Sequence, residues 1–243
     1  CRRHGFSMND VLSLLAYGDA GWGDEILSGV GITVSLSLAT LPLGLGLGLL
    51  LALAKRAEDP ALRLSANIYT TIFRGLPELL TLFLVYYGGQ SLINSAFGAA
   101  GLPALTISSF IAGMIALGMV FSAFASEVFL SAFQAIPAGQ AEAGRSLGLH
   151  RFAIFYKITF PQLARHALPG LSNCWQNLLK DTALVSVIGL ADILRQPSIA
   201  ARVTREPFLF FGLACVLFLI LTFVSGAGIA RLERWSNRGV MAR

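Results

Sequence analysis

The sequence predicts an all-α integral membrane protein with five transmembrane helices, and two observations lead to this prediction. Of the 243 residues, 55% are hydrophobic and only 13% are charged, whereas soluble domains carry about 25% charged residues. No charged residue occurs between Ile26 and Ala54, or between Leu79 and Ser126. A helix needs about 20 apolar residues to cross a hydrocarbon core of about 30 Å, so both runs can span a bilayer. Soluble, fibrous, disulfide-framed and disordered classes are excluded.

Apolar runs between charged residues define the spans. They are predicted at residues 26–54, 66–91, 105–132, 166–190 and 207–230. The longest polar connection, residues 137–165, lies between the third and fourth spans. We therefore expect an N-terminal segment (1–25), a single transmembrane domain (26–231) that includes this loop, and a tail (232–243).

The distribution of lysine and arginine predicts the orientation. Basic residues are concentrated after the first span, in the loop 137–165 and in the tail. Because cytoplasmic loops carry an excess of Lys and Arg, the N-terminus is predicted outside, in the periplasm, and the C-terminus in the cytoplasm. Met8 is a candidate start, which would make Arg2 and Arg3 an upstream extension. No signal peptide is visible, so insertion is expected to depend on the first span.

Small residues in the first span predict close packing. Gly44 and Gly48 form a small-xxx-small pair, a spacing that lets two transmembrane helices approach closely. We expect a structural role for these glycines, since a phosphate-binding loop cannot lie within a lipid-spanning segment.

No pattern predicts catalysis or metal binding. The three cysteines have no framework or metal-ligand spacing, and none of the three histidines lies in the middle of a span. The chain contains no G-x4-G-K-[ST] phosphate loop and no G-x-S-x-G element, so any ATP must be hydrolysed by another chain. Its basic residues are scattered between apolar segments, so no nucleic acid partner is expected.

The loop 137–165 is expected to be folded. Residues 140–147 favour a helix that Gly148 ends, and residues 150–158 favour a second helix that Pro161 ends. The loop carries many apolar and aromatic side chains. They indicate either a docking surface for a partner or packing on the protein's own cytoplasmic face, and the residues alone leave both open.

The same loop carries a motif. Glu142-Ala143-Gly144, Gly148, Ile158 and Pro161 have the spacing E-A-A-x3-G-x9-I-x-L-P, with Gly144 in place of the second Ala and Phe160 in place of Leu. In this respect the chain resembles the permease subunits of ABC importers. Further similarities to the polar amino acid permeases are Arg74-Gly75-Leu76-Pro77, the set Asn173, Lys180, Thr182 and Leu184, and the motifs Trp175-Gln176 and Glu206-Pro207-Phe208.

The resemblance implies a fold and partners. The fold would be that of a type I ABC importer permease in the bacterial inner membrane, surrounded by lipid. The loop would form a coupling helix that contacts an ATPase through Glu142, Ala143, Gly144 and Gly148. The partners would be a second homologous permease, giving a heterodimer, two ATPases that bind ATP and magnesium, and a periplasmic binding protein. This chain would need no cofactor of its own.

The resemblance also implies a class of cargo. It would be a polar or basic amino acid, namely histidine, arginine, lysine or ornithine, or an opine such as octopine or nopaline. A self-contained channel or secondary carrier is the alternative, although the halves of the chain show no evident internal repeat of the kind common in carriers. A membrane scaffold without transport is a third possibility, which the charges within the spans disfavour.

Five charged residues within the predicted spans are candidates for the substrate pathway: Arg74, Glu78, Glu127, Lys180 and Asp181. A charge at a helix centre costs about 2.5–3.5 kcal/mol, so such residues usually face a cavity or pair with each other. Arg74 and Glu78 are four residues apart, on one face of the predicted helix. They form either a structural pair or a site at which Glu78 binds the positive side chain of a substrate.

The other three charges also have two interpretations. Glu127 follows several small residues, which is typical of a tight helix interface, but a substrate contact is equally consistent. Lys180 and Asp181 are adjacent and point to different faces, so Lys180 is expected to contact carbonyls or a carboxylate elsewhere. In the outer segment 191–206, Arg195 and Arg202 are expected either to be part of an ordinary loop or to contact a binding protein.

Overall fold

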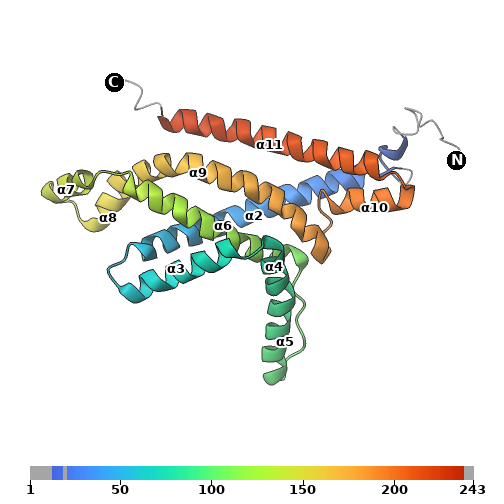
Figure 1. Cartoon of the computed structure of the whole chain (residues 1–243), viewed down its shortest axis with the longest axis horizontal. Helices are drawn as coiled ribbons and strands as arrows, with labels where there is room; N and C mark the ends of the chain where they lie inside the picture. The colour runs from blue at the N-terminus through green and yellow to red at the C-terminus, as the bar shows by residue number, and fades with distance from the viewer. Residues whose placement is uncertain (1–12, 19–20, 238–243) are drawn as a thin grey trace.

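The computed structural model describes residues 13–18 and 21–237, and this described part contains helices and no strands. Four long helices run side by side along the longest axis of the molecule, as Figure 1 shows for α2, α6, α9 and α11. Predictions about Arg2, Arg3 and Met8, and about the tail beyond Asn237, concern residues outside the described part.

The order of elements follows the predicted spans in outline. The elements are α2 (Gly23–Lys55), α3 (Pro60–Gly75), α4 (Glu78–Phe83), the π-helical turn η1 (Leu84–Gly88), α5 (Gly89–Ala99), α6 (Ser109–Gln134), α7 (Ala138–Ser146), α8 (Arg151–Ile154), the π-helical turn η2 (Phe155–Thr159), α9 (Phe160–Asp181), the 3₁₀ helix η3 (Thr182–Ile188), α10 (Arg195–Thr204) and α11 (Pro207–Asn237). Helices α7 and α8 lie at one end of the bundle and α10 at the other (Figure 1).

Three of the described helices, α2, α6 and α11, are long and apolar enough to cross a membrane, and the bent pair of α3 with α4–α5 gives a fourth if it counts as one span. Helix α9 is not among them, because polar residues interrupt its apolar sequence, among them Arg165, His166, Lys180 and Asp181. The number of five spans and the orientation of the termini therefore stay predictions.

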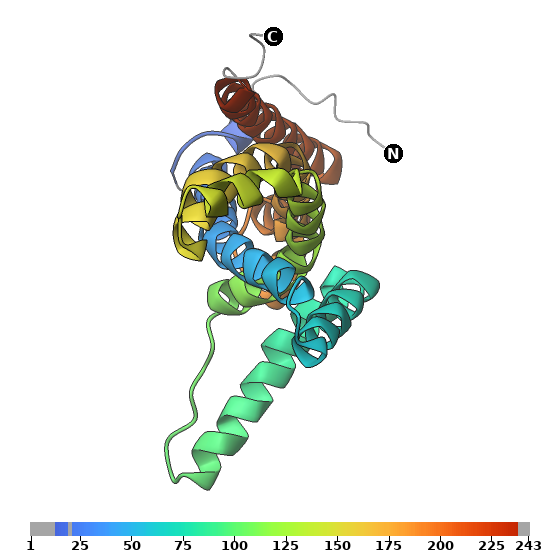
Figure 2. The ribbon, with the colours of Figure 1, turned by 90° about the vertical axis from the view of Figure 1, so that its left-hand side faces the viewer.

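The predicted continuous helix over residues 66–91 is wrong. The chain bends by 109° between α3 and the helix that begins at Glu78. Leu76 is extended, with φ −86° and ψ 142°, because the ring of Pro77 disfavours helical backbone in the residue before it. Beyond this elbow, α4, η1 and α5 form an arm that projects from the bundle (Figures 1 and 2).

Pro161 does not end a helix, contrary to the prediction. Helices α8 and α9 follow one another through η2 without a break, so that residues 151–181 form one continuous helical segment. Pro161 is the second residue of α9, directly after the π-helical turn. A proline lacks the N–H and crowds the preceding turn, and a widened turn can absorb this conflict within a helix.

The closest helix packing lies between α2 and α6, as the glycine spacing predicts. A Cβ atom at Gly44 would lie 2.4 Å from the ring of Phe121. One at Gly48 would lie 2.9 Å from the Cβ of Ala125 and 3.1 Å from the carbonyl oxygen of Ser122. The absence of side chains at these two positions therefore lets the backbones of α2 and α6 approach each other.

Candidate functional site

A cavity of about 390 Å³ lies where the start of α4 meets α6 and α9. Three of the five predicted pathway residues line it: Glu78, Lys180 and Asp181. Its other lining residues are Leu117, Val120, Phe121, Phe124, Asn173, Cys174, Asn177 and Leu178. Two carboxylates, one ammonium group and two amides thus face one space with an apolar wall, which suits a small solute that carries groups of both charges.

Asn177 lines the first cavity with its side-chain amide, and the sequence analysis did not identify it. Asn173, Asn177 and Asp181 are spaced by four residues on α9, so one face of that helix presents them in a row. This period was visible in the sequence and indicates a polar stripe on a helix packed in an apolar environment.

The prediction that Arg74 and Glu78 lie on one helix face is wrong, and with it the first of their two interpretations, a structural pair. The elbow places Arg74 in the last turn of α3 and Glu78 at the first position of α4, so the two residues do not share a helix face. Glu78 lines the cavity, whereas Arg74 pairs with a residue of α6.

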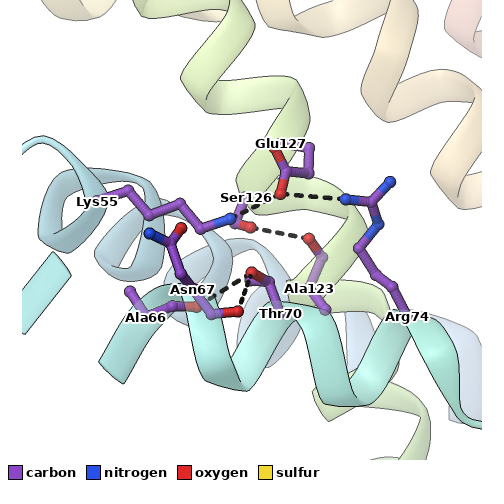
Figure 3. Close-up of polar contacts among 8 residues, drawn as sticks. All are labelled: Lys55, Ala66, Asn67, Thr70, Arg74, Ala123, Ser126 and Glu127. Carbon is purple, nitrogen blue, oxygen red and sulfur yellow. Dashed lines mark hydrogen bonds and ion pairs between the residues drawn. The ribbon is translucent and has the colours of Figure 1, made fainter. Parts of the chain in front are cut away.

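One carboxylate oxygen of Glu127 forms ion pairs with two cationic side chains. Lys55 Nζ lies 2.7 Å from Glu127 Oε1, and Arg74 Nη1 lies 3.1 Å from the same atom, as Figure 3 shows. The side chain of Lys55 is 4% exposed, that of Arg74 45% and that of Glu127 36%. This ionic cluster connects α2, α3 and α6, and it pairs one buried and one half-exposed cation with a single carboxylate.

Glu127 also lines a second cavity, of about 370 Å³, between α6 and α9. Its other lining residues are Val128, Ser131, Ala132, Ala135, His166 and Gly170. The guanidinium of Arg74 lies over the ring of Phe124, 5.5 Å from its centroid, and Phe124 lines the first cavity. Arg74 therefore contacts a lining residue of each cavity.

The predicted coupling residues lie on and after α7. Glu142 and Ala143 are exposed, while Gly144 is buried against Ile154 and Ile158, where a Cβ would lie 2.9 Å from Ile158 Cδ1. Gly148, at φ +75°, ends the helix. The N–H of Leu149 donates to the carbonyl of Gly144, and that of Gly148 to the carbonyl of Arg145, which is the Schellman arrangement that glycine favours.

An exposed aromatic row continues from α7 along α8 and η2. Phe152, Tyr156 and Phe160 are stacked, with ring centroids 6.3 Å apart in each successive pair. Phe152 is 71% exposed, and Leu147 beside α7 is 80% exposed. These apolar side chains do not pack on the protein's own surface, which favours the docking interpretation of the loop.

The two arginines predicted to lie in the outer segment 191–206 have different surroundings. Arg195 Nη1 donates to the carbonyl oxygen of Ser186 at 2.9 Å, so this side chain holds η3 near the start of α10. Arg202 is exposed on α10. Asp192 Oδ1 accepts from the backbone N–H groups of Arg195 and Leu194. Burial raises the pKa of the Asp192 carboxyl to about 6, although these hydrogen bonds act to lower it.

Comparisons with known proteins agree with this arrangement. Residues 44–234 match the family model described as "Binding-protein-dependent transport system inner membrane component". The chain is 42% identical to the nopaline transport system permease protein NocQ of Agrobacterium fabrum, over 96% of this chain and 99% of that protein. It is 41% identical to the histidine/lysine/arginine/ornithine transport system permease protein HisQ of Escherichia coli, over 69% of this chain and 75% of that protein.

A solved structure has the same fold. The structure described as an amino acid ABC transporter with histidines is similar with a TM-score of 0.73 and 31% identity, covering 88% of this chain and 94% of that one. The matched family describes the membrane component of such systems, not the ATPase. The chain is a multi-pass inner membrane protein that belongs to the family of binding-protein-dependent transport permeases, the membrane subunits of ABC importers.

Proposed function

We propose that this chain is a permease subunit of an ATP-driven importer that carries cationic amino acids or opines across the inner membrane. The first cavity carries this proposal. The cavity has more carboxylates than ammonium groups, namely Glu78 and Asp181 against Lys180. An amino acid with a cationic side group has two positive groups and one carboxylate, which complements this set. The names of the relatives, which include nopaline and histidine/lysine/arginine/ornithine systems, support the same class of substrate.

The energy for transport would come from partner chains. The sequence has no phosphate-binding loop. Glu142 and Ala143 are exposed on α7, and in this proposal they would bind an ATPase. In this proposal Gly144 and Gly148 shape the contact, because one lets α7 pack on Ile154 and Ile158 and the other ends the helix. Two ATPases would bind ATP and magnesium, and a second homologous permease would complete a heterodimer.

The orientation in this proposal follows from the positions of α7 and α10 at opposite ends of the bundle (Figure 1). The α7 end would face the cytoplasm and the α10 end the periplasm, where a binding protein delivers the substrate. Arg202, exposed on α10, would contact that binding protein. Arg195 would contribute mainly by fixing α10, since its guanidinium donates to the carbonyl of Ser186.

The coupling to ATP is tested by reconstitution. The chain is incorporated into proteoliposomes with a second permease, the ATPase and the binding protein encoded by neighbouring genes, and uptake of labelled arginine is measured. We expect uptake to require ATP and to fall about tenfold or more in Glu142→Ala, because each 1.4 kcal/mol of lost docking energy weakens binding tenfold. Glu58→Ala, which also removes an exposed carboxylate, is the control. Uptake by the chain alone without nucleotide would instead identify a secondary carrier.

The role of the cavity is tested by its selectivity. In Glu78→Leu we expect the preference for arginine over glutamine to be lost, because the carboxylate that faces the cationic group is removed. Glu78→Asp keeps the charge and should keep the preference. An unchanged preference in Glu78→Leu would contradict a substrate role for Glu78 while leaving the family assignment intact.

A further inference from the structure

The two cavities follow one another along the same pair of helices. On α6, the first cavity is lined by Leu117, Val120, Phe121 and Phe124, and the second by Glu127, Val128 and Ser131. On α9, Asp181, Asn177 and Asn173 line the first cavity, and Gly170 and His166 the second. On α6 the residues of the second cavity come after those of the first, towards α7, and on α9 they come before them, towards α8. The two cavities are therefore successive spaces along one α6–α9 seam.

Arg74 lies at the boundary between these spaces. Its guanidinium carbon is 5.5 Å from the ring centroid of Phe124, the last α6 residue of the first cavity. Its Nη1 atom is 3.1 Å from Oε1 of Glu127, the first α6 residue of the second cavity. A solute that moved along the seam would meet this cluster between the two cavities.

The cluster has the composition of a cation site. An aromatic face and a carboxylate are the two kinds of group that bind a guanidinium or an ammonium ion best. Phe124 and Glu127 are three residues apart on α6, so both side chains lie on one face of that helix. In this structure the chain's own Arg74 is bound there, and its side chain is still 45% exposed.

Glu127 keeps a partner when Arg74 leaves. Lys55 donates to the same oxygen at 2.7 Å, and its side chain is 4% exposed. A buried ion that loses its partner is costly, but here the buried cation and the carboxylate remain paired with each other. Of the two cations on Glu127, Lys55 is thus the permanent one and Arg74 the one that can be exchanged.

We propose that Phe124 and Glu127 form a second cation site on the substrate route, which Arg74 occupies between transport events and from which a guanidinium or primary ammonium group of the substrate displaces it. This inference rests on the proposed function. A substrate without such a group cannot compete for the ring and the carboxylate, so the site selects for cationic side chains a second time, after the cavity that contains Glu78.

The site is tested directly by removing its occupant. In the assembled transporter, Arg74→Ala leaves the site free, and we expect added arginine to raise Tm by more than it does in the wild type. Citrulline, which carries a neutral urea group in place of the guanidinium, should not do so. The double variant Arg74→Ala, Phe124→Leu should lose the extra shift. An arginine shift that stays larger than that of the wild type in the double variant, or an extra shift of equal size with citrulline, would overturn the proposal.

A second measurement does not depend on the folding of Arg74→Ala. We expect Phe124→Leu to slow arginine uptake by about fivefold, which corresponds to about 1 kcal/mol and is the size of a cation–π contact. Phe124→Tyr should retain the rate. The control is Phe223→Leu on α11, where another exposed phenylalanine lies outside both cavities. If the wild type takes up arginine and Phe124→Leu does so at the same rate, only the second site is overturned. If the wild type takes up no arginine, the proposed function itself is contradicted.

Discussion

Helix α6 packs against α2 on one side and against α9 on another, and these two seams differ. Towards α2 it is closely packed, with Gly44 against Phe121 and Gly48 against Ala125. Towards α9 it borders two cavities of about 390 and 370 Å³. Small residues on one helix face allow backbones to touch, while polar residues on the facing helix need space and water. The α9 seam is not open throughout, since a Cβ atom at Gly170 would lie 2.6 Å from Val128 Cγ1. The comparison indicates that α6 is closely packed against α2 and borders cavities beside a local close contact with α9; in our proposal the α9 side borders the substrate route.

The strongest test of the comparison is to add a side chain to the close seam. Gly48→Leu would place atoms within 3.1 Å of the carbonyl oxygen of Ser122, which cannot move as a side chain does. Overpacking of this kind costs about 1–3 kcal/mol, and we expect the upper end of that range. The measurement is the yield and Tm of the purified protein.

The same helix supplies a matched control for this change. A Cβ atom added at Gly46 would have no neighbouring atom within 4 Å, so Gly46→Leu should leave Tm nearly unchanged. Equal losses in the two variants would mean that α2 tolerates no side chain at any of its glycines, and the distinction between the two seams would fail.

The next test concerns Glu127, where the two seams are connected. Glu127→Gln would leave Lys55, which is 4% exposed, without its ionic partner. Breaking a fully buried pair costs about 3–5 kcal/mol. Because Glu127 is 36% exposed, we expect a smaller loss of about 1–3 kcal/mol in the free energy of unfolding. Chemical denaturation measures it, and Glu142→Gln on the exposed face of α7 should cause no loss.

The smallest expected effect concerns the other end of α2, which packs closely on the residues just before α10. There Gly29 of α2 lies against the backbone of Asp192, and Thr33 Oγ1 accepts from the N–H of Ile193 at 3.1 Å. The Asp192 pKa of about 6 lies above the ordinary value of 3.8. The folded protein therefore holds this proton more tightly than the unfolded chain, so the stability that Asp192 contributes is present below about pH 3.8 and is lost as pH rises through about 6.

Asp192→Asn keeps the oxygen that accepts from Leu194 and Arg195 but does not titrate. We expect the Tm of the wild type, relative to this variant, to fall by about 2–4 °C between pH 5 and pH 7.5, the shift that about 1 kcal/mol causes in a protein of this size. Comparison with the variant cancels the titration of other carboxyls. A Tm difference that does not change with pH would show that Asp192 is ionised throughout this range.

Features that depend on local sequence were largely predictable. The apolar runs located α2, α6 and α11, and the spacing of Gly44 and Gly48 predicted a close helix contact. The elbow was missed although its signal is local, since Leu76-Pro77 disfavours helix but lies inside a long apolar run. At Pro161 a helix end was predicted where there is none, because a π-helical turn keeps the helix continuous.

Features that depend on distant residues were not predictable from one sequence. Glu127 lies 72 residues from Lys55, and no local pattern indicates that they meet. The first cavity joins Glu78 to Lys180 and Asp181, but only the bend at the elbow brings the start of α4 to α9. The sequence therefore indicated which charges to examine, while the three-dimensional packing determined their partners.

The uninterrupted helix over residues 151–181 has a mechanical consequence. At a rise of 1.5 Å per residue it is about 45 Å long. One end touches α7 where Ile154 and Ile158 meet Gly144, and the other end carries Asp181 in the wall of the first cavity. The π-helical turn η2 and Pro169 are two points at which this segment can bend, so a shift of α7 would reach the distant carboxylate through a helix that is continuous but jointed at these points.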